Sequence, residues 1–305
     1  VETIGTNAFI YCSSLESVSL PVAETINSQA FYYCSSLERV SLENVKSMGF
    51  MSLSKCRTLE SVSLSSVDSL ANSVFNGCTS LVSVSLPTVK TIGNSVFGGC
   101  TSLESVTFPL VETLGNLVFF NCTSLEQITI PSTVTSIGTN LFSSCTNLTE
   151  VVMESPNYKI DNCFILDNEG EFVCVISGLI TDGEVSSESM TEIASNTFSS
   201  LTNIKSVSFP NVKTIGSDAF SNCTSLESVS LPNADSVGDA AFYGCTSLES
   251  VELGTTAESK LSLGTYIFNG VTTTDVTLTT GKVNEDYVSG NTFNGYEFKE
   301  VIVKE

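Results

Sequence analysis

The sequence lacks histidine and tryptophan altogether. Without histidine, the usual base of serine and cysteine nucleophiles is missing, together with the commonest metal ligand. Basic residues are scarce too, since 12 Lys and Arg stand against 33 Asp and Glu and give a net charge of −21. Such a charge repels nucleic acid and anionic membrane surfaces. The composition therefore argues against an enzyme, a metalloprotein and a nucleic-acid-binding protein.

Long hydrophobic runs are also absent. No apolar stretch approaches the roughly 18 residues that a membrane-spanning helix needs, so we expect no membrane insertion by this segment. No signal-peptide pattern is visible. However, the first residues, VETIGTNAF, match VKTIGNSVF from the middle of the chain. The sequence therefore looks like a piece of a longer protein, and the missing signal says little about its location.

A repeat of 22 residues dominates the chain, as in TVKTIGNSVFGGCTSLESVTFP at Thr88–Pro109. Cysteine returns at one point of each copy, with phenylalanine three positions upstream in most copies. The spacing is 22 residues through Cys12, Cys34, Cys56, Cys78, Cys100 and Cys122, then 23 to Cys145, and 22 again from Cys223 to Cys245. Periods of roughly 20 to 50 residues indicate a solenoid, in which each coil contacts only its neighbours.

Within one copy, alternating apolar residues predict a short strand with one buried face. Leu103, Val106 and Phe108 supply that face, and Pro109 ends the strand because proline cannot donate to a ladder. The L-x-x-V-x-L phase recurs in most other copies. Each coil therefore adds a strand to a growing parallel array.

The second half of each copy predicts a turn and then a helical segment. Gly93 occupies a position that is glycine in most copies, which predicts a positive φ angle. Asn94 is of the type that caps helix N-termini. We therefore expect a short helical turn that carries Phe97 and Cys100 inward at i and i+3. Phe97 should be among the most costly residues to truncate.

The consensus IG-x-x-A-F-x-x-C-x-x-L-x-x-V-x-L-P resembles the BspA-like leucine-rich repeats, also called the Treponema pallidum type, over residues 1–154 and 188–253. The resemblance implies an α/β solenoid: a curved, right-handed leucine-rich repeat superhelix with a parallel sheet on its concave face and short helical turns. It also implies a bacterial protein that is secreted or on the cell surface and used in adhesion. The family brings no catalytic residues.

The repeat is interrupted once and fades at the end. Two strand-like runs, 163–166 and 172–176, flank the turn-forming Asp167–Gly170 and predict a β-hairpin. After Gly254 the pattern decays, which predicts a C-terminal cap. We therefore divide the chain into repeats 1–154, a hairpin insertion 155–187, repeats 188–253, and degenerate repeats with a cap at 254–305.

The eleven cysteines favour buried, unbridged thiols. Zinc sites need clustered pairs of cysteines, which the ladder spacing does not provide. Cysteines one coil apart point the same way, which is poor geometry for a disulfide. A bridge between Cys163 and Cys174, across the predicted hairpin, remains an alternative.

The solvent-facing strand positions form the candidate binding surface, and most are serine or threonine. Their hydroxyls could bind a peptide or glycan; alternatively, small polar residues simply let the strands pack closely and bind nothing. The positions are Ser17, Ser19, Arg39, Ser41, Ser61, Ser63, Ser83, Ser85, Ser105, Thr107, Gln127 and Thr129.

Two charged features accompany this surface. A glutamate ladder runs beside it and either splays into solvent or recruits a cation such as Ca²⁺; it comprises Glu16, Glu38, Glu60, Glu104, Glu126, Glu227 and Glu249. Arg39, Lys46, Lys55 and Arg57 form a positive island in the sequence, although the repeat phase does not place them on one face. Chance also accounts for this clustering. We expect no metal and no cofactor.

These features favour a non-catalytic, extracellular or cell-surface leucine-rich repeat protein that mediates protein–protein or cell-adhesion interactions. Its partner would be a protein or glycan on a host or neighbouring cell, and we expect a monomer. The alternative is a passive spacer or stalk within a larger surface protein, which the scarcity of Trp, Tyr and Arg on the candidate surface favours.

Overall fold

The computed structural model describes residues 1–257 and 260–304. The chain divides into two compact units, Val1–Leu179 and Ile180–Glu305. Both are built from parallel strands that wind in coils. Within the described residues, the helical structure consists of three short 3₁₀ segments, η1 (Ser177–Leu179), η2 (Thr273–Asp275) and η3 (Lys282–Tyr287).

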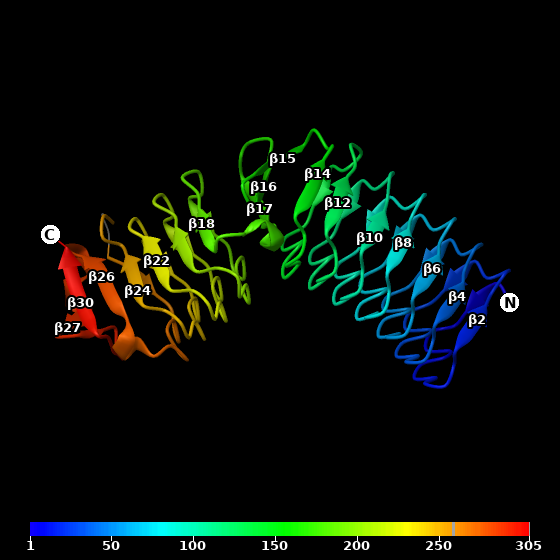
Figure 1. The fold of residues 1–305 in the computed structure, drawn as a ribbon, viewed down its shortest axis with the longest axis horizontal. Helices are drawn as coiled ribbons and strands as arrows, with labels where there is room; N and C mark the ends of the chain where they lie inside the picture. The colour runs from blue at the N-terminus through cyan, green and yellow to red at the C-terminus, as the bar shows by residue number, and fades with distance from the viewer. Residues whose placement is uncertain (258–259, 305) are drawn as a thin grey trace. The chain divides into compact units, whose positions relative to one another are not determined.

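In the first unit, the predicted strands form a parallel sheet in which each strand pairs with its equivalent one coil away (Figure 1). Val106, for example, lies opposite Val84. The sheet contains β2 (Ser17–Ser19), β4 (Arg39–Ser41), β6 (Ser61–Ser63), β8 (Ser83–Ser85) and β10 (Ser105–Thr107). The next two coils continue it with the parallel pair β12 (Gln127–Ile130) and β14 (Glu150–Met153).

The first unit contains a second parallel sheet. Its strands are the two residues that precede the turn position of each coil, as Thr91 and Ile92 precede Gly93. Its seven strands lie side by side in chain order, and a long strand lies in the chain between each neighbouring pair. They are β1 (Thr3–Ile4), β3 (Thr25–Ile26), β5 (Ser47–Met48), β7 (Ser69–Leu70), β9 (Thr91–Ile92), β11 (Thr113–Leu114) and β13 (Ser136–Ile137). One coil therefore consists of a long strand, a short strand and a return turn that carries the phenylalanine and the cysteine.

The interruption of the repeat forms a three-stranded antiparallel sheet. The two predicted runs become β16 (Phe164–Asp167) and β17 (Phe172–Val175), which pair antiparallel. A third strand, β15 (Tyr158–Asp161), pairs with β16 and was not predicted. The Tyr158 hydroxyl donates to the carbonyl of Thr135 (3.2 Å) and accepts from the amide of Ile137 (3.1 Å), so this sheet is tied to the coil at β13.

The second unit repeats the two-sheet coil. Its long strands are β18 (Glu184–Ser186), β20 (Ser206–Ser208), β22 (Ser228–Leu231), β24 (Ser250–Leu253), β26 (Thr277–Gly281) and β30 (Glu300–Lys304). Its short strands are β19 (Glu192–Ile193), β21 (Thr214–Ile215), β23 (Ser236–Val237) and β25 (Ser262–Leu263), and β27 (Val288–Ser289), β28 (Thr292–Phe293) and β29 (Tyr296–Glu297) form an antiparallel sheet. The four-part division of the chain made from the sequence remains a prediction.

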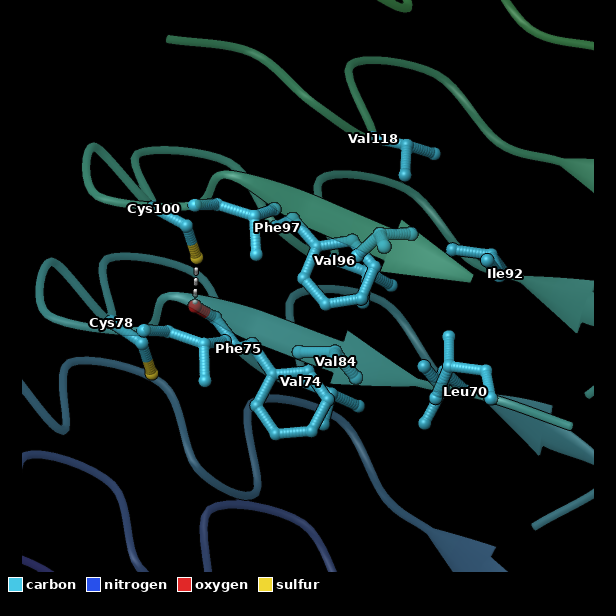
Figure 2. Packing of buried hydrophobic residues seen from close by; sticks show 14 of the residues in the cluster. Leu70, Val74, Phe75, Cys78, Val84, Ile92, Val96, Phe97, Cys100 and Val118 are labelled. Atoms are coloured by element: carbon cyan, nitrogen blue, oxygen red, sulfur yellow. Dashed lines mark hydrogen bonds between the residues drawn. The ribbon is translucent and has the colours of Figure 1, made fainter. Parts of the chain in front are cut away.

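Columns of identical residues fill the core. The rings of Phe75, Phe97 and Phe119 stack nearly parallel, with centroids 5.6 Å apart from coil to coil. Figure 2 shows Phe75 and Phe97 in this arrangement beside Val74 and Val96. All these side chains are fully buried. The prediction that phenylalanine and cysteine point inward is confirmed.

The predicted helical turn is wrong. The return turn contains two residues in the left-handed region, such as Ser95 (φ 53°) and Gly99 (φ 74°), whereas an α-helix needs a negative φ throughout. Between them, the Phe97 amide donates to the carbonyl of Val118 in the next coil (2.9 Å). Alternate amides of the return turn bond to the neighbouring coil in this way, so they are not free to close a helix.

The readings of Gly93 and Asn94 are corrected for the same reason. Gly93 does not have a positive φ; a Cβ there would lie 2.8 Å from the Asn72 backbone nitrogen, so the glycine permits close approach of two coils. Asn94 does not cap a helix. The Asn94 backbone N–H donates to the Asn72 side-chain Oδ1 (2.8 Å), and the Asn94 Oδ1 accepts from the Asn116 backbone N–H (2.9 Å). The asparagines form a ladder between coils.

Truncation of one stacked ring tests this core. We expect Phe97→Ala to lower the free energy of unfolding by about 3–5 kcal/mol, because it leaves a cavity between two neighbouring rings. Urea unfolding monitored by circular dichroism measures the loss. Phe120→Ala is the matched control, since Phe120 lies in the next return turn but is 40% exposed. Equal losses in the two variants would contradict the stacked core.

Candidate binding surface on the strand face

The outward side chains of β2 to β14 form a continuous polar surface, which we call the strand face. Eleven of the twelve predicted site residues are exposed on it, and Ser41 is half-buried. The valine between each pair points into the core, as Val84 does between Ser83 and Ser85. Period-two alternation explains this placement. The phase predicted from the sequence therefore holds, while a binding role for these residues remains a prediction.

Side chains on the strand face lie close enough to interact across strands. The Thr107 hydroxyl donates to the Ser85 hydroxyl one coil away (3.3 Å). Such a contact uses part of the hydrogen-bonding capacity of each hydroxyl and leaves the rest facing solvent. The strand face therefore presents ordered donors and acceptors at a regular spacing.

A groove of about 460 Å³ lies at the ends of β8, β10, β12 and β14. Five predicted residues line it: Ser85, Ser105, Thr107, Gln127 and Thr129. The strand-ending prolines of three successive coils, Pro87, Pro109 and Pro131, also line it, together with Val152 and Glu154. The remaining seven predicted residues lie elsewhere on the strand face, so the structure brings less than half of the set together.

The strand phase also places Val152 on the outward side of its strand, at the end of the repeat block, but Val152 was not among the twelve predicted site residues. It is 41% exposed and lies opposite Thr129, at a position where most coils carry serine or threonine. That departure from the pattern was the available signal. Val152 gives one end of the groove an apolar wall, whereas the other strands supply hydroxyls.

The glutamate ladder stands in solvent. All seven of its members are exposed. Glu104 and Glu126 contribute to a second, polar hollow beside the groove, with Ser105 and Gln127 between them. Among the described residues, no group of three or more His, Cys, Asp or Glu is placed to hold a metal ion. Exposure favours the splayed arrangement of these carboxylates over a cation site.

The cysteines lie behind the strand face as a ladder of buried thiols. The Cys100 Sγ donates to the carbonyl of Phe75 in the preceding coil (3.2 Å), which Figure 2 marks with a dashed line. Cys78 and Cys122 make the same contact to Leu53 and Phe97. Cys174 carries a free, buried thiol, so the alternative of a bridge to Cys163 is not realised.

Burial makes these thiols weak acids. It raises the pKa of Cys78, Cys145 and Cys174 to about 12 from an ordinary value of 9.0, because a thiolate would lose its solvation in the core. The nucleophilic form of cysteine is the thiolate. Cys78, Cys145 and Cys174 are therefore protonated and unreactive at neutral pH, and their side chains serve packing.

A family model describes the repeat just outlined. The model for the BspA type leucine rich repeat region, which describes six copies of the repeat, matches residues 2–109, 69–169 and 183–305. The chain belongs to the BspA-type leucine-rich repeat family. No curated protein matches this BspA-type chain at a significant level.

Solved structures share the fold of this BspA-type chain. A leucine rich cell surface protein from Faecalibacterium prausnitzii is 25% identical, with a TM-score of 0.78 over 100% of this chain and 83% of that one. The pneumococcal vaccine antigen PcpA is 21% identical, with a TM-score of 0.61 over 100% and 71%. A leucine-rich repeat protein from Bacteroides ovatus is 23% identical, with a TM-score of 0.55 over 100% and 88%.

In residues 1–257 and 260–304, no helix has the length and apolarity needed to cross a bilayer.

The thiol ladder predicts a loss of stability in alkaline solution. Above about pH 9 the unfolded thiols ionise, whereas the folded thiols stay protonated up to about pH 12. Unfolding then releases a proton from each, so each such thiol raises the unfolding equilibrium constant about tenfold per pH unit in this window. Urea titrations in reducing buffer at several pH values measure the slope.

Cys78→Ala is the variant that tests this assignment. It should be less stable than the wild type at neutral pH, because it leaves a small cavity, but its pH slope should be shallower by one proton. Cys12→Ala is the control, because Cys12 is only half-buried. An unchanged slope for Cys78→Ala would show that other groups control the alkaline transition.

Proposed function

We propose that this protein is a non-catalytic leucine-rich repeat protein, secreted or displayed on a bacterial surface, that binds a macromolecular partner through its strand face. The groove over β8 to β14 carries the proposal, because it joins five hydroxyl or amide side chains to an apolar wall. The F. prausnitzii relative is described as a cell surface protein and PcpA as a vaccine antigen, which supports the location.

The mechanism we infer is rigid display. Every long strand of the strand face pairs with a neighbouring coil, and β4, β6 and β8 pair with the coils on both sides. Binding therefore orders few additional groups, and that lowers its entropic cost. An extended peptide or glycan chain, on a host or neighbouring cell, would lie across the strands with its polar groups on the hydroxyls. We propose that the protein does this as a monomer.

A passive spacer is the second candidate. The twelve predicted strand-face positions include one arginine and no aromatic residue, whereas interface hot spots are enriched in Trp, Tyr and Arg. In that case the hydroxyl surface would serve close packing of the strands, and the partner would bind modules outside this chain.

Filling the groove with two bulky side chains distinguishes the two candidates. We expect Thr107→Arg/Thr129→Arg to weaken retention on an array of host matrix proteins and neutral glycans by about tenfold or more, because the two long side chains fill the groove. Ser63→Arg, on the same face but outside the groove, is the matched control. Surface plasmon resonance with the full chain measures both, and circular dichroism checks the fold.

Two results would reject the binding proposal. The first is a wild-type chain that retains none of the array components, which supports the spacer. The second is equal retention by the groove variant and by Ser63→Arg.

A further inference from the structure

Three tyrosines and two cations gather on the return turns of the first three coils. We call Tyr11, Tyr32, Tyr33, Lys55 and Arg57 the tyrosine cluster. The rings of Tyr11 and Tyr32 meet edge to face with centroids 5.7 Å apart, and Tyr33 lies 5.7 Å from Tyr11 and 6.2 Å from Tyr32. The Arg57 guanidinium lies 5.4 Å from the centroid of the Tyr33 ring.

The tyrosine cluster lies outside the strand face and is accessible to solvent. Tyr11, Tyr33 and Lys55 occupy the same place in successive coils, one residue before Cys12, Cys34 and Cys56. The Tyr11 amide bonds to the carbonyl of Tyr32 (2.8 Å), which holds the first two coils in register here. Tyr11 is 60% exposed, Arg57 is exposed, and Tyr32, Tyr33 and Lys55 are half-buried. None of the five lines the groove over β8 to β14.

These bulky side chains sit on unfavourable backbone. The φ angles of Tyr11, Tyr33 and Lys55 are 59°, 60° and 64°, in the left-handed region that Gly and Asn occupy most easily. The next coils of the first unit carry Gly77, Gly99, Asn121 and Ser144 at this place. The first three coils therefore hold Tyr and Lys where small residues would relieve strain, and such positions tend to be functional.

The two cations of the cluster are not neutralised. The other members of the positive island have partners: Arg39 lies 3.7 Å from Glu38 and Lys46 lies 2.8 Å from Glu24. In the part of the chain that the structure describes, neither Lys55 nor Arg57 forms an ion pair with a carboxylate. The net charge of −21 repels anions from the molecule as a whole, but these two cations give the return turns a local positive patch that can attract one.

We propose that the tyrosine cluster binds an anionic oligosaccharide, one that carries carboxylate or sulfate groups. The apolar faces of sugar rings pack on the exposed Tyr rings, and the phenol hydroxyls exchange hydrogen bonds with sugar hydroxyls. The planar guanidinium of Arg57 is suited to two parallel hydrogen bonds to a carboxylate or sulfate. The Lys55 side chain lies over Gly77 in the next coil, so it extends the positive patch away from the tyrosine rings.

Size favours a sugar over a protein partner. The three coils span about 10 Å at the usual strand spacing, which accommodates a short oligosaccharide. A stable protein interface buries roughly 1,200 Å² or more. Beyond the cluster, Gly77 is covered by the Lys55 side chain, and Gly99 offers no side chain to extend the contact.

The main test is a substitution that another coil already contains. Tyr33→Asn introduces the residue found at Asn121, so we expect thermal stability to be maintained or increased while the affinity for anionic oligosaccharides falls about tenfold or more. Arg57→Gln should cause a similar loss, and Arg57→Lys a smaller one. Tyr266→Asn is the control, since Tyr266 is also an exposed tyrosine with a positive φ (57°) but lies in the second unit.

Isothermal titration of the full chain provides the readout, with heparin oligosaccharides as the sulfated probe, hyaluronan oligosaccharides as the carboxylated one, dextran as a neutral sugar and polyglutamate as an acidic peptide. Binding of an anionic sugar that is lost in Tyr33→Asn, but kept in Tyr266→Asn and in Thr107→Arg/Thr129→Arg, supports the proposal. It is overturned if no anionic sugar binds, if Tyr33→Asn binds as the wild type does, or if polyglutamate binds equally well. Because the groove variant is in the set, failure of this inference is separable from failure of the strand-face proposal.

Discussion

Hydrogen bonds between neighbouring coils are the interaction on which this molecule depends. Backbone amides of the return turn, the thiols and the asparagine side chains all find their partners in a neighbouring coil, as Phe97, Cys100 and Asn94 show. Few of these polar groups could be satisfied within a single coil. Each coil is therefore stable only as a member of the array, and the stacked phenylalanines add apolar burial to the same register.

Structural features that depend on contacts within one strand could be predicted from the sequence, whereas those that depend on contacts between coils could not. Period-two alternation identified the buried face of the long strands. The burial of Val84 and Val106 could be predicted because it follows from the residue pattern within each strand alone. Asn94 and Gly93 were misread because the same residue types serve helix caps and left-handed turns within a segment, whereas their contacts here lie 22 residues away. A local pattern cannot distinguish these two uses.

The candidate site was predictable to a similar degree. Strand phase placed Thr107 and Thr129 on the exposed face, but the groove also needs prolines from three turns and Val152 from the last of the four strands. The tyrosine cluster was missed for a different reason. Its cations were noticed as an island in the sequence, yet the rings of Tyr11 and Tyr33 come near Arg57 only after the coils stack.

The uniform columns of the core have a further consequence for how the chain reaches its native state. A coil that docked one repeat too far along would still set phenylalanine on phenylalanine and asparagine on asparagine, so neighbouring alignments are nearly degenerate in energy. Irregular segments break that degeneracy. The longer coil that ends at Cys145 and the β15–β17 sheet have no equivalent elsewhere in the first unit. They fix the register in which the coils stack, and they disfavour domain swapping of coils between molecules.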